Sequence, residues 1–563
     1  MGTINIGIVA HVDAGKTSLT ERILYETHVI GEIGRVDKGT TQTDSLDLEK
    51  SRGITIKASV VSFFVNHLKI NLIDTPGHAD FLAEVERSLS VLDGAILLIS
   101  AVEGIQAQTK ILFSALRKLR IPTIIFINKI DRSGAQSDEL IKRVKEKLAE
   151  RIIPLTRVEH IGTKQAFVVQ NQLHDPAFRQ ACIEQIALDD EQLLAAYVEG
   201  ETITEGQVRT ALLQQVREAR LAPVFFGSAI TGVGVTELLA ELGSYFPSTA
   251  GREDDLLSGV VFKLEKEATG EKVAYIRVFS GRMGVRTEVN LQREKRDGAI
   301  ERYAGKIQKL HLFQKGKTVQ VQQVGAGEFG KVWGLREVKI GDVVGEWSEH
   351  IKTLHFATPR METRIEATSR EHDHRLYQAL VELAEEDPLI SVLKDDVHQS
   401  IYLRIFGEVQ KEVIEAILKE RYGLDVRFAE TGIVCIEKPR GTGQALETIG
   451  AGNPFMATVG FLVEPGLPGS GVTYKSIPGA LPLALLRAIE ETVHATLEQG
   501  VYGWEVTDIV VTLTHTGYNS HKRDGTTGGD FRNLVPLVLM EALSQAGTEV
   551  YEPINQFELS VPV

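Results

Sequence analysis

Residues 10–18 combine a lysine and hydroxyl side chains in a spacing that suits phosphate binding. The segment reads AHVDAGKTS and follows the apolar run INIGIVA. In the phosphate-loop pattern G-x-x-x-x-G-K-[ST], Gly15, Lys16 and Thr17 fit, whereas Ala10 stands at the first glycine. Backbone N–H groups of such a loop hold phosphates, its lysine reaches the β- and γ-phosphates, and its threonine ligates Mg²⁺. Because of Ala10, an ordinary strand–turn–helix junction explains the segment equally well on its own.

The segment DTPGH, residues 74–78, follows another apolar run and offers groups of the same kind. Asp74 can hold Mg²⁺ through a water molecule, and the backbone N–H of Gly77 can bind a γ-phosphate. His78 can orient an attacking water, as a glutamine does in other enzymes of this chemistry. The plainer interpretations are a proline–glycine turn and a histidine with a structural role.

Two later segments suit the recognition of a base. In NKID, residues 128–131, Asn128 and Asp131 can bind the edge of guanine, with the aspartate accepting from ring N–H groups. Ser228 and Ala229 end the last apolar run of this region. A helix N-cap is the plainer interpretation for Asn128 and for Ser228.

All four segments end predicted strands, and this arrangement favours one common site. Ligands of an open α/β sheet bind outside the carboxyl ends of its strands. We therefore predict a guanine-nucleotide site. Its predicted members are Ala10, His11, Val12, Asp13, Ala14, Gly15, Lys16, Thr17, Ser18, Asp74, Gly77, Asn128, Lys129, Asp131, Ser228 and Ala229.

The segment RGITI, residues 52–56, is predicted to be a mobile switch. Thr55 would contact Mg²⁺ and the γ-phosphate only in the triphosphate state, which would order the segment before hydrolysis; a surface strand start is the plainer interpretation. We predict Lys16 and His78 as catalytic residues and Thr17 and Thr55 as Mg²⁺ ligands. Since the chain offers no obvious arginine finger, we expect slow intrinsic hydrolysis that a partner stimulates.

Several domains must position these residues, and the predicted fold class is multidomain α/β and β. Residues 1–248 alternate apolar runs with amphipathic helical patterns, which predicts a doubly wound α/β domain with a mostly parallel sheet. Residues 256–352 show short strands and turn glycines without a long helix, which predicts a β-barrel. We predict an α+β sandwich over residues 356–432 and another α/β unit over residues 433–547.

The composition is that of an ordinary globular protein. Of 563 residues, 43% are hydrophobic and 25% are charged. The net charge of −14 argues against indiscriminate nucleic-acid binding but permits a local basic contact. The chain lacks a long apolar run and a basic N-terminal region, and its cysteines are Cys182 and Cys435. We therefore expect a cytoplasmic protein without a transmembrane helix, a disulfide framework or a cysteine-based zinc site.

A long basic segment occupies a strand-to-helix link late in the chain. It reads THTGYNSHKRDGTTGGDFRNL, residues 514–534, after the β-branched run over residues 506–513. Such links normally need only a few residues. A solvated surface loop is the plainer interpretation, and a loop that contacts a partner is the other.

The chain resembles the translational GTPases, such as elongation factor G and its relatives. The segments that carry this resemblance are AHVDAGKTS, RGITI, DTPGHADF, NKID and SA. Six longer segments are similar to the ribosomal protection proteins that confer tetracycline resistance, most of all to the branch from oxytetracycline producers. One of them, AGNPFMATVGF, stands where elongation factor G carries a glycine-rich segment. The six segments cover residues 36–56, 81–109, 451–461, 464–474, 498–508 and 529–553.

The resemblance covers nearly the whole chain and implies a GTP- and Mg²⁺-dependent factor that acts on the ribosome. Such a factor docks as a monomer, inserts loops near the decoding site, dislodges tetracycline and hydrolyses GTP to dissociate. Its implied partners are small-subunit rRNA near the decoding site and the GTPase-activating region of the large subunit. The implied ribosome-reaching residues are Pro468, Ser470, Tyr518, Asn519, Ser520, His521, Lys522 and Arg523.

Within these loops, the resemblance implies that Tyr518 stacks on a base and that the basic residues contact phosphates. The family loop is shorter and carries a proline, so the identity of the tip residue stays open. A tight hairpin is the plainer interpretation of the turn over residues 466–471.

The resemblance also implies a ferredoxin-like sandwich over residues 356–432 and a domain-four unit over residues 433–547. A fifth domain and a C-terminal helix are expected to follow, so residues 548–563 are predicted to begin a truncated fifth domain. The competing functions are a translocase like elongation factor G, a ribosome-binding regulatory GTPase without a drug role, and a non-catalytic remnant.

Overall fold

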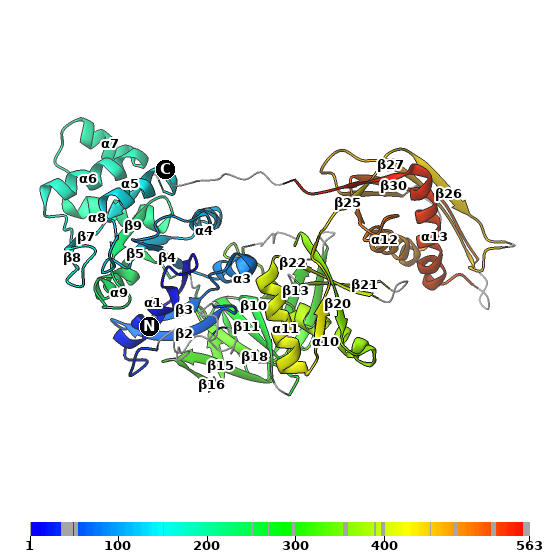
Figure 1. Cartoon of the computed structure of the whole chain (residues 1–563), viewed down its shortest axis with the longest axis horizontal. Helices are drawn as coiled ribbons and strands as arrows, with labels where there is room; N and C mark the ends of the chain where they lie inside the picture. The colour runs from blue at the N-terminus through cyan, green and yellow to red at the C-terminus, as the bar shows by residue number, and fades with distance from the viewer. Residues whose placement is uncertain are drawn as a thin grey trace. The chain divides into compact units, whose positions relative to one another are not determined.

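Figure 1 shows the computed structural model of the chain, which divides into two compact units. The first unit holds residues 1–358, 367–392 and 406–426, and the second holds residues 359–366, 393–405 and 427–563. The structure describes all residues except 1, 35–48, 50–54, 150, 249–250, 268, 295–298, 353–358, 388–389, 396–399, 451, 477–480, 520–524 and 555–563. Among the residues described, no helix combines the length and the apolar character needed to cross a bilayer.

The first unit begins with a seven-stranded sheet whose strand order is β2-β3-β1-β4-β5-β9-β6. β2 runs antiparallel to β3, and the other neighbouring strands run parallel, so the predicted doubly wound α/β fold is confirmed. The bounds are β1 (Thr3–Ala10), β2 (Ser59–Val65), β3 (Leu68–Asp74), β4 (Gly94–Ser100), β5 (Thr123–Asn128), β6 (Ile152–Pro154) and β9 (Ala222–Phe226). The predicted end of the last strand was wrong, because β9 stops at Phe226 and Ser228 lies beyond it.

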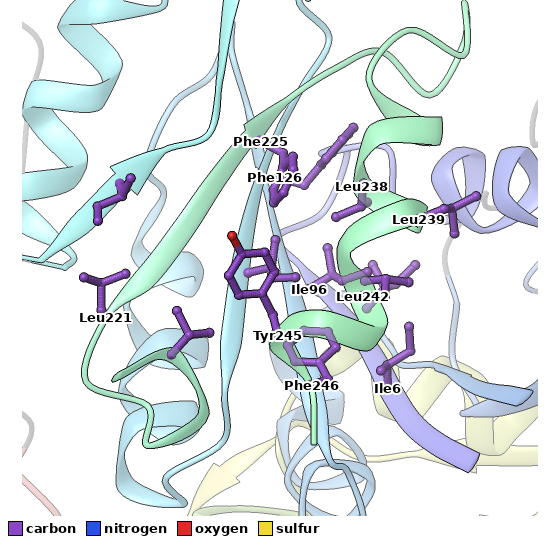
Figure 2. Close-up of a cluster of buried hydrophobic side chains, with 14 of the residues drawn as sticks. Ile6, Ile96, Phe126, Leu221, Phe225, Leu238, Leu239, Leu242, Tyr245 and Phe246 are labelled. Carbon is purple, nitrogen blue, oxygen red and sulfur yellow. The ribbon is translucent and has the colours of Figure 1, made fainter. Parts of the chain in front are cut away.

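Side chains of this sheet alternate between two hydrophobic layers, as expected for strands covered on both faces. Ile96 and Phe126 point into a layer shared with α1 and α9, which Figure 2 shows around Tyr245. Leu97 and Ile125 point into the opposite layer, which α3, α4 and α5 cover. The helix bounds are α1 (Lys16–Glu26), α3 (Leu82–Leu89), α4 (Ala107–Lys118), α5 (Asp138–Lys147) and α9 (Val235–Tyr245).

A helical insertion separates β6 from β9. Its hairpin pairs β7 with β8, and α6 packs against α8 (Figure 1). The bounds are β7 (Thr156–Glu159), β8 (Phe167–Gln170), α6 (Pro176–Ile186), α7 (Glu191–Val198) and α8 (Glu205–Arg217).

The next part of the first unit is an eight-stranded antiparallel sheet of order β14-β13-β19-β10-β11-β18-β15-β16. Leu291 of β13 and Leu310 of β15, from distant places in this order, share one buried cluster, so the sheet curls around its core as a barrel does. The bounds are β10 (Ser258–Lys266), β11 (Lys272–Ser280), β13 (Glu288–Glu294), β14 (Ile300–Lys306), β15 (Lys309–Gln314), β16 (Lys317–Val321), β18 (Phe329–Trp333) and β19 (Val343–Gly345). A small second sheet pairs β12 (Arg282–Gly284) with β17 (Gln323–Gly325).

The α+β region is divided between the two units. Its helices α10 (Asp373–Glu386) and α11 (Glu408–Tyr422) belong to the first unit. Its five-stranded sheet has the order β21-β22-β20-β23, and β24 pairs with β20. The strand bounds are β20 (Met361–Ala367), β21 (Ser391–Asp395), β22 (Ser400–Ile405), β23 (Val426–Phe428) and β24 (Gly432–Ile433).

The second unit contains a four-stranded sheet of order β26-β27-β30-β28 that shares a core with α12 and α13. A three-stranded sheet of order β29-β25-β31 lies in the same unit. The bounds are β25 (Ile436–Pro439), β26 (Gly443–Glu447), β27 (Ala457–Pro465), β28 (Val472–Ser476), α12 (Leu483–Leu497), β29 (Glu505–Val506), β30 (Ile509–Tyr518), α13 (Gly528–Ala546) and β31 (Thr548–Tyr551).

The loop within the long basic segment late in the chain is shorter than the sequence predicts. β30 continues to Tyr518 because it pairs with β27 as far as Ala457, and α13 already begins at Gly528. The connection is therefore confined to residues 519–527. Ser520, His521, Lys522 and Arg523 lie outside the described residues, as do residues 52–54 of the switch and residues 555–563.

Candidate functional site

A pocket of about 460 Å³ opens beyond the carboxyl ends of β1, β3, β4, β5 and β9. This is the edge where an open α/β sheet binds its ligand. Fifteen sequence-predicted residues line it: His11, Val12, Asp13, Gly15, Lys16, Thr17, Ser18, Thr55, Gly77, His78, Asn128, Lys129, Asp131, Ser228 and Ala229.

The loop between β1 and α1 holds its shape through backbone conformation and one long-range contact. Asp13 and Gly15 adopt left-handed conformations, with φ of 65° and 95°. The Asn128 side chain donates from Nδ2 to the carbonyl of Ala14 over 2.8 Å. A Cβ on Gly15 would lie 2.5 Å from that Nδ2, so this position needs glycine for space as well as for its φ. The loop leads directly into the N-terminus of α1, where backbone N–H groups can hold an anion.

Lys16 joins three parts of the pocket. Its ammonium Nζ lies 2.5 Å from Oδ1 of Asp74 and 2.8 Å from Oγ1 of Thr55. Oγ1 of Thr17 lies 3.4 Å from Oγ1 of Thr55. Two ligands of an octahedral Mg²⁺ stand about 3 Å apart, because each metal–oxygen bond is about 2.1 Å long. The two hydroxyls are therefore spaced to hold one such ion, and the lysine is placed to meet a phosphate.

His78 lines the pocket just after the end of β3. Its Nδ1 accepts a hydrogen bond from the backbone N–H of Asp80 over 3.2 Å, and its side chain is about one-third exposed, at 30%. Gln108 donates from its side chain to the carbonyl of Gly77, which holds the preceding residue. The imidazole is thus held through Nδ1, and His78 lines the pocket.

The end of the pocket that suits a base is built around Asn128. While its Nδ2 holds the phosphate loop, its Oδ1 accepts from the backbone N–H of Ala229 over 2.9 Å. Ser228 supports the same turn, because its Oγ accepts from the N–H of Thr231 over 3.2 Å. Lys129 pairs with Glu103 over 2.9 Å. Burial raises the pKa of Glu103, but the hydrogen bond and charge of Lys129 outweigh it, so the net shift is downward.

His11 is a buried part of the phosphate loop. Its Nδ1 lies 3.2 Å from Oγ1 of Thr109 on α4. Burial lowers the pKa of this imidazole, with the charge of Lys129 acting in the same direction, while Glu103 and Asp13 oppose the shift. His11 therefore stays neutral at pH 7 and adds no positive charge to the loop.

The second unit brings two loops together at one end of its four-stranded sheet. Asn519 donates its N–H to Oγ1 of Thr526 over 2.7 Å and accepts the Thr526 N–H over 3.0 Å. The Thr526 hydroxyl donates to the carbonyl of Met456, and Oδ1 of Asp530 accepts the Met456 N–H over 3.2 Å. These contacts join the base of the 519–527 connection to the turn before β27. Tyr518, 41% exposed, stands at their edge.

The turn over residues 466–471 lies at the other end of the same sheet. β27 pairs Ala457 with Tyr518 at one end and Pro465 with Ile509 at the other, roughly 25 Å away at the usual rise per residue. Asp508 fastens this turn by accepting the N–H groups of Gly466 and Gly471. Pro468 and Ser470 are therefore not neighbours of Tyr518 within this unit.

Comparisons with known proteins follow the same division of the chain. The profiles that match are the elongation factor Tu GTP-binding domain over residues 1–248 and elongation factor G domain 2 over 256–346, domain III over 356–430 and domain IV over 444–547. A crystal structure of a protein from Thermus thermophilus matches with a TM-score of 0.65 at 23% identity, covering 97% of this chain and 85% of that one. This likeness supports the shared fold.

Two relatives that are similar along most of their length are named as resistance proteins. The chain is 44% identical to the oxytetracycline resistance protein of Streptomyces rimosus, over 100% of this chain and 86% of the relative. It is 42% identical to the tetracycline resistance protein TetP of Clostridium perfringens, over 99% of this chain and 84% of the relative. The chain belongs to the tetracycline resistance proteins of the translational GTPase family. It is a GTPase with domains of elongation factor G, and this membership implies an interaction with the ribosome.

Within this resistance GTPase, three predicted site residues do not line the pocket. Ala10 is buried at the end of β1, Ala14 is buried in the loop, and Asp74 lies behind Lys16. Three pocket-lining residues were missed, namely Glu103, Arg132 and Ile230. Arg132 and Ile230 could have been found from their position, because each directly follows a segment assigned to a strand end, whereas Glu103 follows β4, whose end carried no assigned segment.

Proposed function

We propose that this protein releases tetracycline-class drugs from the ribosome in a GTP-dependent cycle and uses GTP hydrolysis to dissociate. The observation that carries the proposal is similarity to named resistance proteins along essentially the whole chain, at 42–44% identity. The protein would act as a monomer in the cytoplasm, where ribosomes work. Its partners would be small-subunit rRNA near the decoding site and the GTPase-activating region of the large subunit.

Within this cycle, Lys16 binds the β- and γ-phosphates of GTP. The nucleotide would take over the ammonium that Asp74 holds at 2.5 Å, and Asp74 would then reach the metal through water. Backbone N–H groups of residues 11–18 hold the phosphates, and the N–H of Gly77 binds the γ-phosphate. His78 orients the attacking water with the imidazole edge that Asp80 leaves open.

The hydroxyls of Thr17 and Thr55 would hold Mg²⁺, and their 3.4 Å spacing supports this. A bound Mg²⁺ would neutralise charge on the β- and γ-phosphate oxygens. Thr55 already lines the pocket beside Lys16, and in the triphosphate state it would contact Mg²⁺ and the γ-phosphate.

Guanine would lie at the Asn128 end of the pocket. The carboxylate of Asp131 accepts from the ring N–H groups, while Lys129, Ser228 and Ala229 line the same end. Asn128 shapes this end through its bonds to Ala14 and Ala229.

The paired loops around Tyr518 and Asn519 form the ribosome-reaching end of the second unit. Ser520, His521, Lys522 and Arg523 belong to the same connection, and their charges suit phosphates. Pro468 and Ser470 would contact the ribosome at a separate place. The proposed domains are 1–248, 256–352, 356–432 and 433–547, and 548–563 would begin a fifth.

The test is release of radiolabelled tetracycline from bacterial 70S ribosomes by the full chain with GTP. Lys16→Ala is the inactive variant, and Lys142→Ala, an exposed lysine on α5, is the matched control. We expect GTP-dependent release by the wild type and the control, and none by Lys16→Ala.

Ribosome-stimulated GTP hydrolysis without drug release would contradict the proposal and favour a translocase or a regulatory factor. A translocation assay with the same preparation would separate these two. Absence of both activities would favour the non-catalytic remnant.

A further inference from the structure

Helix α11 begins without a capping side chain of its own. Its N-cap residue is Gly407, whose backbone is extended at φ −176° and ψ 178°. A helix start leaves backbone N–H groups without intrahelical partners, and a Ser, Thr, Asp or Asn at the N-cap usually accepts from the N2 or N3 amide. Here these are the amides of Val409 and Gln410.

Asp80 supplies the missing cap from a place 329 residues earlier in the chain. Its Oδ2 accepts the N–H of Val409 over 3.0 Å and the N–H of Gln410 over 3.3 Å. A Cβ on Gly407 would overlap all three atoms of the Asp80 carboxyl group, so the glycine leaves the room in which the carboxylate sits. A carboxylate is also favoured at a helix N-terminus by the helix dipole.

The same residue holds His78. The backbone N–H of Asp80 donates to Nδ1 of His78 over 3.2 Å, and Oδ1 of Asp80 lies 3.4 Å from that nitrogen. The backbone amide of Asp80 can donate to Nδ1 and its carboxylate can accept from Nδ1, so both groups of Asp80 face this one nitrogen. Asp80 thus fixes the orientation of the imidazole through Nδ1.

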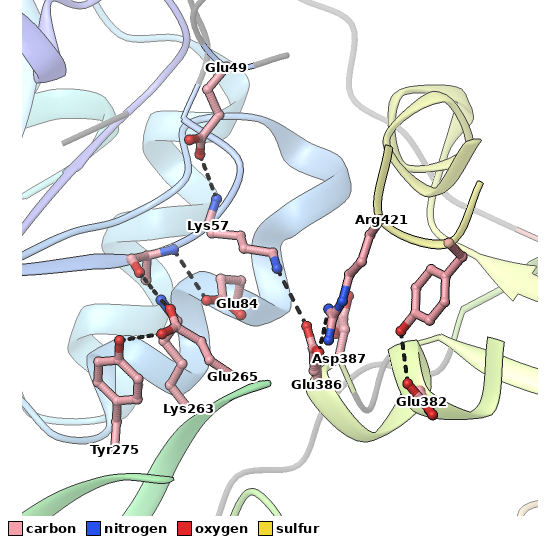
Figure 3. Close-up of polar contacts among 12 residues, drawn as sticks. Glu49, Lys57, Glu84, Lys263, Glu265, Tyr275, Glu382, Glu386, Asp387 and Arg421 are labelled. Carbon is pink, nitrogen blue, oxygen red and sulfur yellow. Dashed lines mark hydrogen bonds and ion pairs between the residues drawn. The ribbon is translucent and has the colours of Figure 1, made fainter. Parts of the chain in front are cut away.

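Further contacts hold α10 and α11 against the nucleotide-binding domain independently of Asp80. Ile56, Phe81 and Val413 form a small buried cluster. Figure 3 shows Lys57, which lies just after Thr55, reaching Glu386 at the end of α10 over 3.5 Å. Loss of the Asp80 cap alone would therefore leave the docking of these helices largely in place.

We propose that Asp80 is a positioning residue that couples the docking of α11 to hydrolysis, by capping α11 with its carboxylate while its amide orients His78. The helix fixes the carboxylate, the carboxylate fixes the short turn after Gly77, and the turn fixes the imidazole. Nucleotide binding is not involved, because Asp80 does not line the pocket. The inference rests on the proposed role of His78 in GTP hydrolysis.

Steady-state GTP hydrolysis with 70S ribosomes tests the coupling, with kcat and KM measured separately. Removing an N-cap shifts a local equilibrium by about fivefold to tenfold, and we expect Asp80→Ala to lower kcat by about that factor with KM for GTP unchanged. Asp80→Asn keeps a capping oxygen and the backbone amide, so most of the kcat should return. Asp138→Ala, an exposed aspartate in the first turn of α5, is the matched control.

Gly407 provides a second variant, because it is the N-cap residue of α11 and lies far in the sequence from the segments that line the nucleotide pocket. Gly407→Ala leaves Asp80 in the chain but fills its place, and should lower kcat as Asp80→Ala does. Adding Gly407→Ser to Asp80→Ala gives α11 a cap of its own. The double variant should regain thermal stability while its kcat stays low, which a purely structural role would not produce.

The inference is overturned if Asp80→Ala and Gly407→Ala hydrolyse GTP at the wild-type kcat, or if Gly407→Ser restores the kcat of Asp80→Ala. A rise in KM equal to the fall in kcat would also contradict it. These results require an active wild type; a wild type without ribosome-stimulated hydrolysis would instead contradict the proposed function.

Discussion

The nucleotide pocket and the loop end of the second unit are built in different ways. In the pocket, side chains hold one another: Lys16 contacts Asp74 and Thr55, and Asn128 joins Ala14 to Ala229. At the loop end, the contacts lie at the base, where Thr526 and Asp530 hold neighbouring backbone.

This difference separates two kinds of recognition. Interlocked side chains keep a fixed geometry before the ligand arrives, which suits a reaction that depends on positioning. Among the described residues of the loop end, the contacts named above lie at its base, and the 41% exposed side chain of Tyr518 is available to a large partner. Substitutions in the pocket should therefore disturb several properties at once, whereas substitutions at the loop end should disturb one.

The largest effect is expected for Lys16→Ala. The substitution removes the cation that is proposed to bind the phosphates, and it also removes the contacts to Asp74 and Thr55. Loss of one preorganised stabilising group typically lowers kcat by about 10²–10³-fold, and we expect at least that loss in ribosome-stimulated GTP hydrolysis. A kcat of Lys16→Ala within tenfold of the kcat of the control Lys142→Ala would contradict a phosphate-binding role for Lys16.

Asn128→Ala should weaken both stability and nucleotide binding. Its side chain is buried, and its removal leaves the carbonyl of Ala14 and the N–H of Ala229 without these partners. Each buried polar group left unsatisfied costs about 1–3 kcal/mol, so the midpoint of thermal unfolding should fall along with the affinity for GTP. The control is Asn290→Ala, an exposed asparagine on β13. An unchanged melting temperature would show that the pocket is less interlocked than its contacts imply.

Tyr518→Ala should affect drug release alone. Stacking of one base on an aromatic side chain is worth about 1–3 kcal/mol, so release of labelled tetracycline should slow by about tenfold while ribosome-stimulated hydrolysis continues. Tyr518→Phe keeps the ring and should release the drug normally. Tyr502→Ala removes an exposed tyrosine elsewhere in the second unit and serves as the control. A parallel loss of hydrolysis in Tyr518→Ala would remove the distinction between the two regions.

Sequence patterns predicted the local structure of both regions but not the contacts between distant segments. The apolar run before DTPGH is β3, and the run INIGIVA before AHVDAGKTS lies in β1. Such features depend on neighbouring residues. The Asp80 cap depends on a helix 329 residues away, and no local pattern marks it.

The loop end shows the same limit. The basic segment after residue 513 has turn residues throughout, yet β30 runs on to Tyr518 because β27 offers it partners. Register also places Pro468 at the opposite end of that strand pair, which spacing in the sequence does not reveal. In the pocket, the Ala10 departure from the phosphate-loop pattern had little consequence, because Ala10 is buried in β1 and does not line the pocket.

The smallest effect is expected at the rim of the pocket, where Lys129 pairs with a Glu103 side chain that is 40% exposed. Exposed pairs contribute about 0–1 kcal/mol, so Glu103→Gln should lower the free energy of unfolding only slightly at pH 7. The pKa of Glu103 is lowered in the folded state, so its contribution is present above the ordinary carboxyl pKa of about 4.3 and is lost as the pH falls through the lowered value. The difference between wild type and Glu103→Gln should therefore shrink from pH 7 to pH 3.5, and a double-mutant cycle with Lys129→Gln would isolate the pair. If the difference in the free energy of unfolding between the wild type and Glu103→Gln grew as the pH fell, it would have the wrong sign for this pair. A small difference that disappears toward acid would mean that Lys129 and Glu103 are not part of the network of contacts that fixes the pocket.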